Sequence, residues 1–501
     1  MLVRKKYKPQ KNQKGLVLLV LIIIIVLAFF TYSLSGMSIT QIHMDQTKNT
    51  LVTLKEAKQA VINYVVTYSD RGVDNDYGVF PHPETIKNGD YGNMPGNVGT
   101  KNTNTVGWFP WRSLDLPALK DESGTCLFYA VSGTYKLGGT VQADMINEDS
   151  IGMFRIVDDA LNVIQGANME DRVVALVIAP GGPVAGQVRN PLVILSNCGD
   201  DYGNVPAYLE GNGVVDNSFV SAVDDTTDQF IHATETSKDA AVPYNDKFLT
   251  ITRDEVWKAI VKRSDFKQDM ETLTQALAAC AANYANLADN TGRRLPWSTK
   301  VNLGARLNYR DDASYDDDSA AEGYSGRYPF NVGSSNDAID PVKLTEDSLF
   351  EIAGLCNNFG IDWEGEVIDL ETDSSKYRQL WNNWKDHFFY IISKSYEPDN
   401  SGAERTCTVA GTSCVTVNAT EHAGAVIFSG SRLTGATRND KSLLIDYLED
   451  VKHTEFAVEQ VNKAGDRTYV YTDPQTDTAN DIMYCIQDQP TGTPLDVVEC
   501  L

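Results

Sequence analysis

The first seventy residues carry two consecutive hydrophobic patterns. From Leu16 to Phe30 every residue is apolar, and the uncharged stretch continues to Leu34, giving 19 positions. A helix of about 20 apolar residues spans a hydrocarbon core of about 30 Å. Positions 16–36 are therefore predicted to form a transmembrane segment. A signal peptide cleaved near Ser35 is the alternative.

The second pattern is that of an amphipathic helix. Positions 37–68 contain neither Pro nor Gly, and apolar side chains recur there every three or four residues, at Leu51, Leu54, Ala57, Val61, Tyr64, Val65 and Tyr68. The simplest interpretation is one helix from Leu16 to about Tyr68, roughly 80 Å long at 1.5 Å per residue. The alternative is a break at Gly36, followed by a separate helix that docks on the rest of the chain.

The remainder of the chain contains an internal repeat. Segment 176–190 aligns without gaps on 425–439, and six of the fifteen positions are identical. The identical pairs are Val177/Val426, Ile178/Ile427, Gly181/Gly430, Gly186/Gly435, Arg189/Arg438 and Asn190/Asn439. An aromatic run precedes each copy (127–132 and 388–393), and Tyr-Leu-Glu follows it (208–210 and 447–449). Because these features keep a common order, we expect two similar halves.

Each half is predicted to combine a helix with strands. Thr252 and Glu255 form a capping-box pattern, and the periodic run after them predicts a second helix over 253–287. Proline corners, such as Phe80-Pro81 and Leu295-Pro296, then lead from helix into strand-rich sequence. We therefore expect an α+β fold with antiparallel sheets, divided into a first half (37–250) and a second half (251–501). One large α+β domain is the alternative.

Charge is distributed unevenly. The leader, 1–15, carries six basic residues and no acidic one, which leaves 37 basic and 68 acidic residues in the rest of the chain, a net charge of −31. A basic segment before an apolar run predicts a cytoplasmic amino terminus and a periplasmic bulk. The acidic bulk argues against nucleic-acid binding, which requires a basic footprint.

The order of basic leader, Gly15, apolar helix and amphipathic continuation resembles type IV prepilins and the pseudopilins of type II secretion. The resemblance is best over residues 11–80. It implies cleavage by a prepilin peptidase between Gly15 and Leu16, followed by packing of the apolar half-helix in a filament core. It also implies that each half is a pilin-like head, in which a helix backs a sheet.

One position departs from the family pattern. Filament-shaft subunits have Glu at the fifth mature position, whereas this chain has Val20 there. A Glu in an apolar bundle needs a partner charge, so a subunit without one need not sit below another. Together with the size of the chain, this favours a large tip or initiating subunit.

The sequence therefore predicts a structural minor pilin or pseudopilin-like subunit of a type IV pilus or related filament. Its expected partners are other pilin or pseudopilin subunits, the inner membrane and the prepilin peptidase. The alternative is a single-pass anchored periplasmic or surface protein that binds or adheres to a ligand and never polymerises. No nucleophile, zinc or nucleotide motif is evident, so an enzyme is not expected.

Eight cysteines in a periplasmic chain predict disulfides. Short spacing suggests the pairs Cys407–Cys414 and Cys485–Cys500, and elimination leaves Cys126–Cys198 and Cys280–Cys356. No cofactor is expected. Weak candidates for a calcium site are acidic, Gly-bearing turns that contain Asp74, Asp76, Asp200 and Asp201, although solvated turns are the preferred explanation of these residues.

Overall fold

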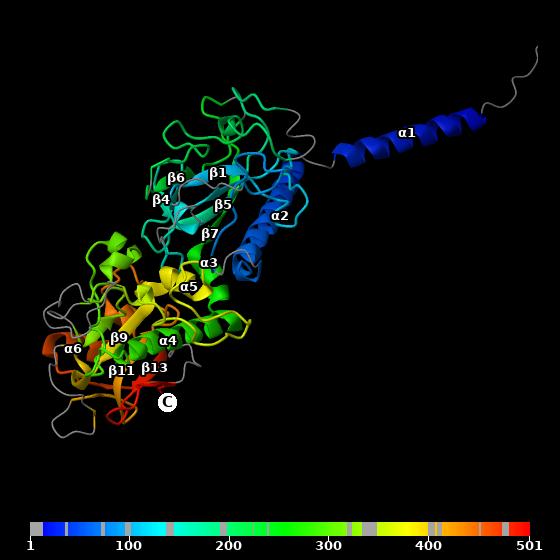
Figure 1. The fold of residues 1–501 in the computed structure, drawn as a ribbon. Helices are drawn as coiled ribbons and strands as arrows, with labels where there is room; N and C mark the ends of the chain where they lie inside the picture. The colour runs from blue at the N-terminus through cyan, green and yellow to red at the C-terminus, as the bar shows by residue number, and fades with distance from the viewer. Residues whose placement is uncertain are drawn as a thin grey trace, which may run out of the picture.

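A computed structural model describes most of the chain. It places residues 14–35, 39–71, 76–95, 102–136, 145–190, 198–223, 225–237, 240–317, 323–332, 348–398, 406–407, 413–449, 452–472 and 480–500. Within these ranges lie two seven-stranded sheets, each with a long helix packed against it (Figure 1). The chain is therefore mixed α+β with two sheets, as predicted.

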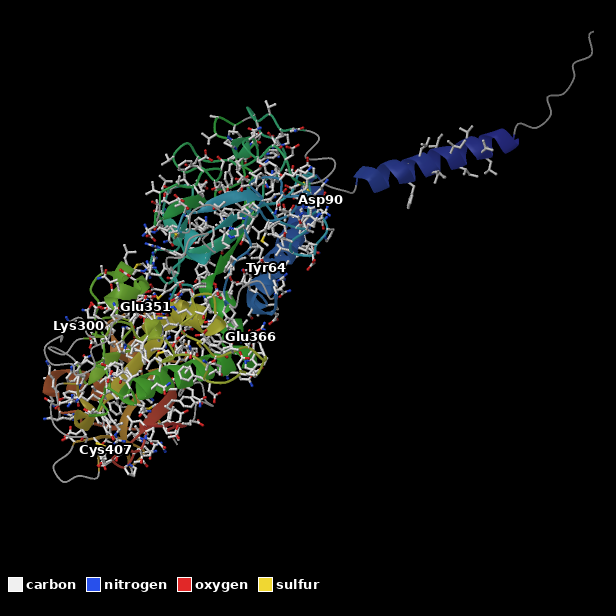
Figure 2. All side chains as sticks on the ribbon, viewed as in Figure 1. Tyr64, Asp90, Lys300, Glu351, Glu366 and Cys407 are labelled. Atoms are coloured by element: carbon white, nitrogen blue, oxygen red, sulfur yellow. A yellow bond between two sulfur atoms is a disulfide. The ribbon has the colours of Figure 1, made fainter. Side chains whose placement is uncertain are left out.

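Two helices precede the first sheet. They are α1 (Lys14–Ser35) and α2 (Ile39–Val66), so the single helix predicted from Leu16 to Tyr68 is described as two, and residues 36–38 between them lie outside the described ranges. Figure 1 shows α1 standing clear of the sheets. The side chains described in α1, those of 18–29, are all exposed, and Figure 2 shows them on opposite sides of the helix axis.

Over the residues that the structure describes, no helix combines the length and the apolar character that crossing a membrane requires.

The first sheet has the order β1-β2-β5-β3-β4, with β7 also paired to β5 and β6 to β3. Its strands are β1 (Thr105–Trp108), β2 (Phe128–Val131), β3 (Phe154–Val157), β4 (Val163–Gln165), β5 (Val173–Ala179), β6 (Asp228–Ile231) and β7 (Lys247–Thr252). Every residue of β2 and β5 is buried. Their uninterrupted apolar sequences fit strands that are covered on both faces.

The second sheet has the order β12-β10-β11-β13-β14, with β9 paired to both β11 and β8. Its strands are β8 (Ser325–Arg327), β9 (Phe388–Ile392), β10 (Val415–Val417), β11 (Thr420–Phe428), β12 (Thr468–Tyr469), β13 (Ile482–Gln487) and β14 (Val497–Glu499). β9 is buried throughout, as β2 is in the first sheet.

The two sheets repeat one pattern of strand pairing. β1-β2-β5-β7 pair antiparallel in the same order as β8-β9-β11-β13. The register agrees as well: Phe128 pairs with Ile178, and Phe389 pairs with Ile427. The sequence alignment equates these same two isoleucines. In both sheets a side strand (β3 or β10) has a parallel neighbour (β6 or β12), which departs from the predicted all-antiparallel arrangement.

The remaining helices are short except for α4. They are α3 (Arg253–Ile260), α4 (Ser264–Ala285), α5 (Lys376–Trp384) and α6 (Lys452–Asn462). The described 3-10 turns are η1 (Ser69–Arg71), η2 (Gly133–Tyr135), η4 (Val205–Ala207), η5 (Arg306–Arg310), η6 (Asp312–Ser314), η7 (Leu349–Glu351), η8 (Lys385–His387), η9 (Lys394–Tyr396) and η10 (Leu444–Asp446). The predicted capping box is present, because Glu255 accepts the backbone N–H of Thr252 at 2.9 Å.

The prediction of one continuous helix over 253–287 is wrong, because α3 and α4 are separate. Arg263, just before α4, has an extended backbone with φ −68° and ψ 140°. Its guanidinium donates to the carbonyl of Val66 at 2.7 Å and pairs with Asp70 and Asp265. A tertiary contact with the end of α2 thus overrides a local preference for helix.

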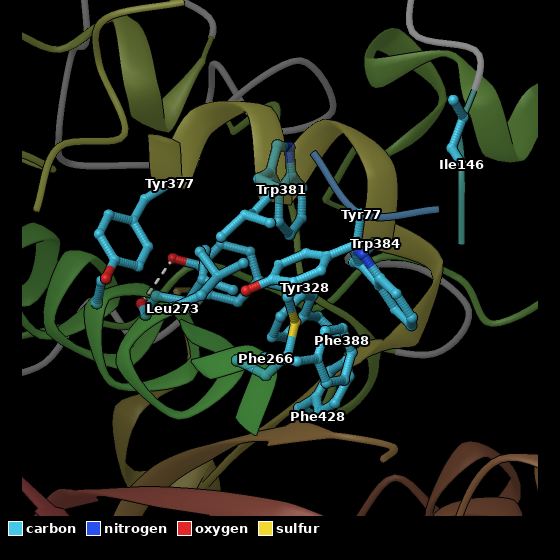
Figure 3. Close-up of a cluster of buried hydrophobic side chains, with 14 of the residues drawn as sticks. Tyr77, Ile146, Phe266, Leu273, Tyr328, Tyr377, Trp381, Trp384, Phe388 and Phe428 are labelled. Atoms are coloured by element: carbon cyan, nitrogen blue, oxygen red, sulfur yellow. Dashed lines mark hydrogen bonds between the residues drawn. The ribbon is translucent and has the colours of Figure 1, made fainter. Parts of the chain in front are cut away.

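A continuous apolar cluster runs between the two sheets. It extends from α2 through α3 and α4 to α5 and the second sheet. Figure 3 shows part of it, where Trp384 of α5 meets Phe266 and Phe428, and Trp381 of the same helix meets Phe388. The Trp257 and Trp384 ring centroids are 5.5 Å apart. Each sheet also has its own smaller cluster on the opposite face.

Four disulfides are present, which confirms the prediction of disulfide bonding. They join Cys126 to Cys198, Cys280 to Cys356, Cys407 to Cys414 and Cys485 to Cys500, the pairs expected from spacing and elimination. Three lie in the second half, and the last links β13 to the residue that follows β14.

Candidate functional site at the junction of the two halves

In each half, one arginine closes the loop that follows the central strand. In the second half, Arg438 donates from Nη2 to the carbonyl of Ser429 at 2.9 Å and from Nε to the carbonyl of Asp446 at 2.8 Å. Its guanidinium lies 4.8 Å from the centre of the Tyr447 ring. The side chain is thus enclosed by the loop that it holds.

Arg189 has the same role in the first half. It donates to the carbonyls of Gly181 at 2.6 Å and Ala207 at 2.8 Å, and lies 5.2 Å from the centre of the Tyr208 ring. Gly181 and its counterpart Gly430 both have positive φ, at 63° and 57°, where glycine is favoured. The identical glycines and arginines of the repeat therefore serve a local scaffold.

A pair of buried carboxyl groups lies near each arginine. Asp481 accepts the backbone N–H of Glu449 at 3.2 Å, and Asp246 accepts that of Glu210 at 2.9 Å. Burial raises the pKa of all four carboxyl groups, that of Glu449 to about 7. Two buried carboxylates repel each other, so each pair favours a shared proton or a neighbouring cation.

The two pairs differ in the group beside the aspartate. In the second half, Lys452 Nζ lies 3.2 Å from Asp481 Oδ2, and both side chains are almost completely buried. In the first half, the Asn217 amide donates to Asp246 at 3.0 Å. The second half therefore places an amine where the first places an amide.

A second charged cluster joins the two halves. It is formed where segment 145–150 of the first half packs against the second half. Arg438 donates to Glu148 at 2.6 Å, and the Tyr447 hydroxyl donates to Asp149 at 2.8 Å. Arg438 thus holds its own loop and also binds the first half.

His387 lies between two carboxylates of this cluster. Its Nδ1 is 2.8 Å from Asp386 and its Nε2 is 3.4 Å from Asp149. Lys441 pairs with Asp386 and lies 3.9 Å from Asp149. Burial opposes ionisation, but the positive charges of Lys441 and His387 hold the pKa of both Asp149 and Asp386 below the usual range.

Three side chains of this cluster are potential metal ligands. Among the described residues, Glu148, Asp149 and His387 are the one group of three potential ligand side chains close enough to share an ion, within 4.8 Å of one another. The cations of Arg438 and Lys441 already lie against the carboxylates. A divalent ion would have to displace them and meet their repulsion, so the cluster fits a network of ion pairs better than a metal site.

A cleft of about 1000 Å³ opens beside this junction. Trp257, Phe266, Met270 and Phe428 form much of its apolar floor, while Arg253 and Asp254 are among the charged residues at its wall. Its volume lies at the upper end of the range for small-molecule sites.

The residues predicted for processing lie in α1. Gly15 and Leu16 are in its first turn, and Val20 is 48% exposed. Cleavage between Gly15 and Leu16 stays a prediction.

The calcium candidates that the structure describes belong to no group of three ligand side chains close enough to share an ion. Asp74 lies outside the described residues, and Asp76 is buried and accepts the amide of Asn383 at 2.6 Å. Asp201 accepts from Asn204 at 3.1 Å, and the oxygens of Asp200 accept from neighbouring protein groups. Calcium binding at these turns stays untested.

Sequence reasoning missed several of the contacts described above. The repeat alignment included the arginines and the Tyr-Leu-Glu tripeptides, but their contacts were not inferred. The repeated dipeptide before the last central strand, Asn245-Asp246 and Asn480-Asp481, was an available signal. Segment 145–150 gave no such signal, because its partners are far away in the sequence. Lys452 gave none, because it has no counterpart in the first half.

Comparisons with protein families, with curated proteins and with solved structures find no match to this chain.

Proposed function

We propose that this chain is a structural, prepilin-like subunit, held in the inner membrane by α1 and carrying two pilin-like heads into the periplasm or onto a filament. The observation that carries the proposal is a repeated arrangement behind an apolar amino-terminal helix. In each half a helix packs against a sheet, and the two halves share the strand register and the loop held by an arginine. Two such heads fit a structural role.

Exposure of α1 supports an anchoring role. Its large apolar side chains from Leu18 to Phe29 are 48–70% exposed. Apolar surface on all sides of a helix is stable only when lipid or other helices cover it. The apolar sequence, 16–34, also extends beyond both ends of the part of α1 whose side chains are described. The four disulfides fit an oxidising compartment.

Processing is the decisive test. We expect the mature protein to begin at Leu16, with 486 residues, when the full chain is expressed with its cognate prepilin peptidase and its amino terminus is determined by mass spectrometry. Substituting Gly15→Val should abolish cleavage, whereas Gly36→Val, at the only other glycine near the anchor, should leave it unchanged. An intact Met1, or cleavage near Ser35, would refute the proposal.

A second function has a specific observation in its favour. The cleft of about 1000 Å³ beside the junction is large enough for a small ligand, which fits an anchored binding or adhesion protein that does not polymerise. Sheared filaments separate the two proposals. A prepilin-like subunit should co-purify with them, and a non-polymerising anchored protein should stay in the membrane fraction at normal expression.

A further inference from the structure

The contact between Lys452 and Asp481 brings a lysine side chain against a carboxyl group inside the protein. Lys452 is the first residue of α6, and Asp481 directly precedes β13. Nζ lies 3.2 Å from Asp481 Oδ2, and the side chains are only 2% and 1% exposed. Oδ1 of the same carboxyl group is buried and has no hydrogen-bond partner among the described residues. The carboxyl group is therefore held by one oxygen, the one that faces the amine.

A third group completes the arrangement. Glu449 is 4% exposed, and its backbone N–H donates to the Asp481 oxygen that faces Lys452. Its carboxyl oxygens accept the backbone N–H groups of Asn480, at 2.8 and 2.7 Å, and of Asp481, at 3.4 Å. Burial, and then the charge of Asp481, raise the pKa of Glu449 to about 7. Near neutral pH this carboxyl group can therefore both give and take a proton.

The surroundings are apolar and aromatic. Leu448, Phe456, Tyr447, Tyr469 and Met483 belong to the buried cluster on this face of the second sheet. An apolar setting penalises charge, and burial raises the pKa of Asp481 accordingly. The neutral acid is the form of a carboxyl group that condenses with an amine.

Two other buried lysine–carboxylate contacts among the described residues lack this combination. Lys441 faces Asp386, whose pKa is lowered, so that carboxyl group stays ionised. Lys376 lies 2.7 Å from Asp269 but also pairs with the 43%-exposed Glu364, and its own pKa is raised, so the ammonium form persists. These two contacts are ion pairs.

We propose that Lys452 and Asp481 form an intramolecular isopeptide bond, with Glu449 as the proton-transfer group. Transfer of one proton from the ammonium to the carboxylate gives an amine and a neutral acid. Nζ then attacks Cγ of Asp481, so that the N–C bond forms and one C–O bond breaks. Glu449 protonates the departing hydroxyl, which leaves as water, and regains a proton from Nζ. One amine and one acid thus give one amide and one water, with no other reactant.

The first half is an internal comparison. Its equivalent carboxyl pair, Glu210 and Asp246, faces the Asn217 amide instead of an amine. No cross-link can form there. In the second half the bond would tie the start of α6 to the start of β13, across 29 residues, and would add to the constraint from the Cys485–Cys500 disulfide.

Peptide mass spectrometry of the full-length protein tests the proposal. After reduction, alkylation and trypsin digestion, an amide at Lys452 blocks cleavage there. We expect a branched peptide joining 442–463 to 468–501, lighter by one water, about 18 Da, than the sum of its parts. Separate peptides 442–452 and 453–463, with 468–501 unmodified, would overturn the proposal.

Substitutions assign the roles. Lys452→Met and Asp481→Ala should each abolish the branched peptide, and Glu449→Gln should greatly slow its formation. Lys376→Met removes a buried lysine from an ion pair and should leave the branched peptide unchanged. Because the wild-type peptide map is decisive by itself, a variant that fails to fold leaves the test intact. A water loss that persists in Lys452→Met would place the bond elsewhere and overturn the assignment.

Discussion

Arg438 and Glu148 face each other at 2.6 Å, although 290 residues separate them in the sequence. Both side chains are almost completely buried. The same guanidinium caps the carbonyl groups of its own loop, as Arg189 does in the first half, so this ion pair is an addition to a repeated scaffold. It turns a local structural arginine into a connection between the two halves.

Removing this connection should be costly. Arg438→Met leaves Glu148 buried without its cation, and we expect a loss of about 3–5 kcal/mol in the free energy of unfolding. Urea unfolding followed by tryptophan fluorescence measures it. The double variant Arg438→Met, Glu148→Leu should recover part of the loss, because it no longer buries an uncompensated charge.

Arg432 provides the matched control. It pairs with Asp254, but the two side chains are 14% and 42% exposed. Arg432→Met should therefore cost less than about 1 kcal/mol. Equal losses for the two arginines would contradict the assigned role of Arg438.

Glu84 should make the protein less stable as pH rises towards neutrality. Burial raises the pKa of Glu84 from 4.5 to about 7, even though it accepts hydrogen bonds from Tyr202 at 2.6 Å and from the backbone of Gly92 at 2.8 Å. The folded state thus keeps a proton that the unfolded chain releases. The contribution of Glu84 to the free energy of unfolding is fully present below pH 4.5 and is lost as pH rises through about 7. This loss amounts to about 2 kcal/mol.

The variant Glu84→Gln tests this dependence, because its side chain stays neutral. Thermal unfolding at pH values from 4.5 to above 7 should show a smaller fall in Tm for the variant than for the wild type. Parallel curves would show that Glu84 does not carry the pH dependence.

The repeat could be predicted from sequence because the backbone geometry of the two loops requires the same residues in both halves. Gly181 and Gly430 have positive φ, and Arg189 and Arg438 donate to equivalent carbonyl groups, so few residue types suit these positions. Alignment of the two halves detects such constraints directly. The same alignment pairs Ile178 with Ile427, and the structure gives these two residues equivalent positions in their sheets.

The junction could not be predicted, because its contacts are tertiary. Arg263 interrupts the helix that periodicity predicts over 253–287, since its guanidinium binds the end of α2. Asp149 and His387 have no spacing that relates them, and they meet only when the halves pack. Lys452 has no counterpart in the first half, so alignment of the halves does not detect it.

The carboxyl-terminal disulfide should contribute measurably to stability. Cys485 and Cys500 close a loop with a sequence separation of 15, for which the chain-entropy model gives about 3 kcal/mol. We expect Cys485→Ser, Cys500→Ser to lose about this amount in urea unfolding. Replacing Cys407 and Cys414, whose separation is 7, should cost less. The opposite order would mean that loop length does not set the contribution.

The junction should open before the rest of the protein in acid. The charges of Lys441 and His387 hold the pKa of Asp149 and Asp386 below 3.8. Their contribution to stability is therefore present above pH 3.8, and it is lost as pH falls through the lowered values of the folded state. Hydrogen-exchange protection in segments 145–150 and 383–387 should fall below pH 3.8 while the amides of β5 and β11 remain protected.

Two variants separate this mechanism from general acid unfolding. Asp386→Asn removes a buried ion-pair partner of Lys441, so it should lower junction protection at neutral pH and leave a weaker response to acid. Asp440→Asn is the control, because that carboxylate also has a lowered pKa but accepts its hydrogen bonds from Ser442 near the surface. If both variants respond to acid like the wild type, the junction carboxylates do not set the acid limit. Loss of protection in β5 and β11 at the same pH as in the junction would lead to the same conclusion, since the halves would then unfold as one unit.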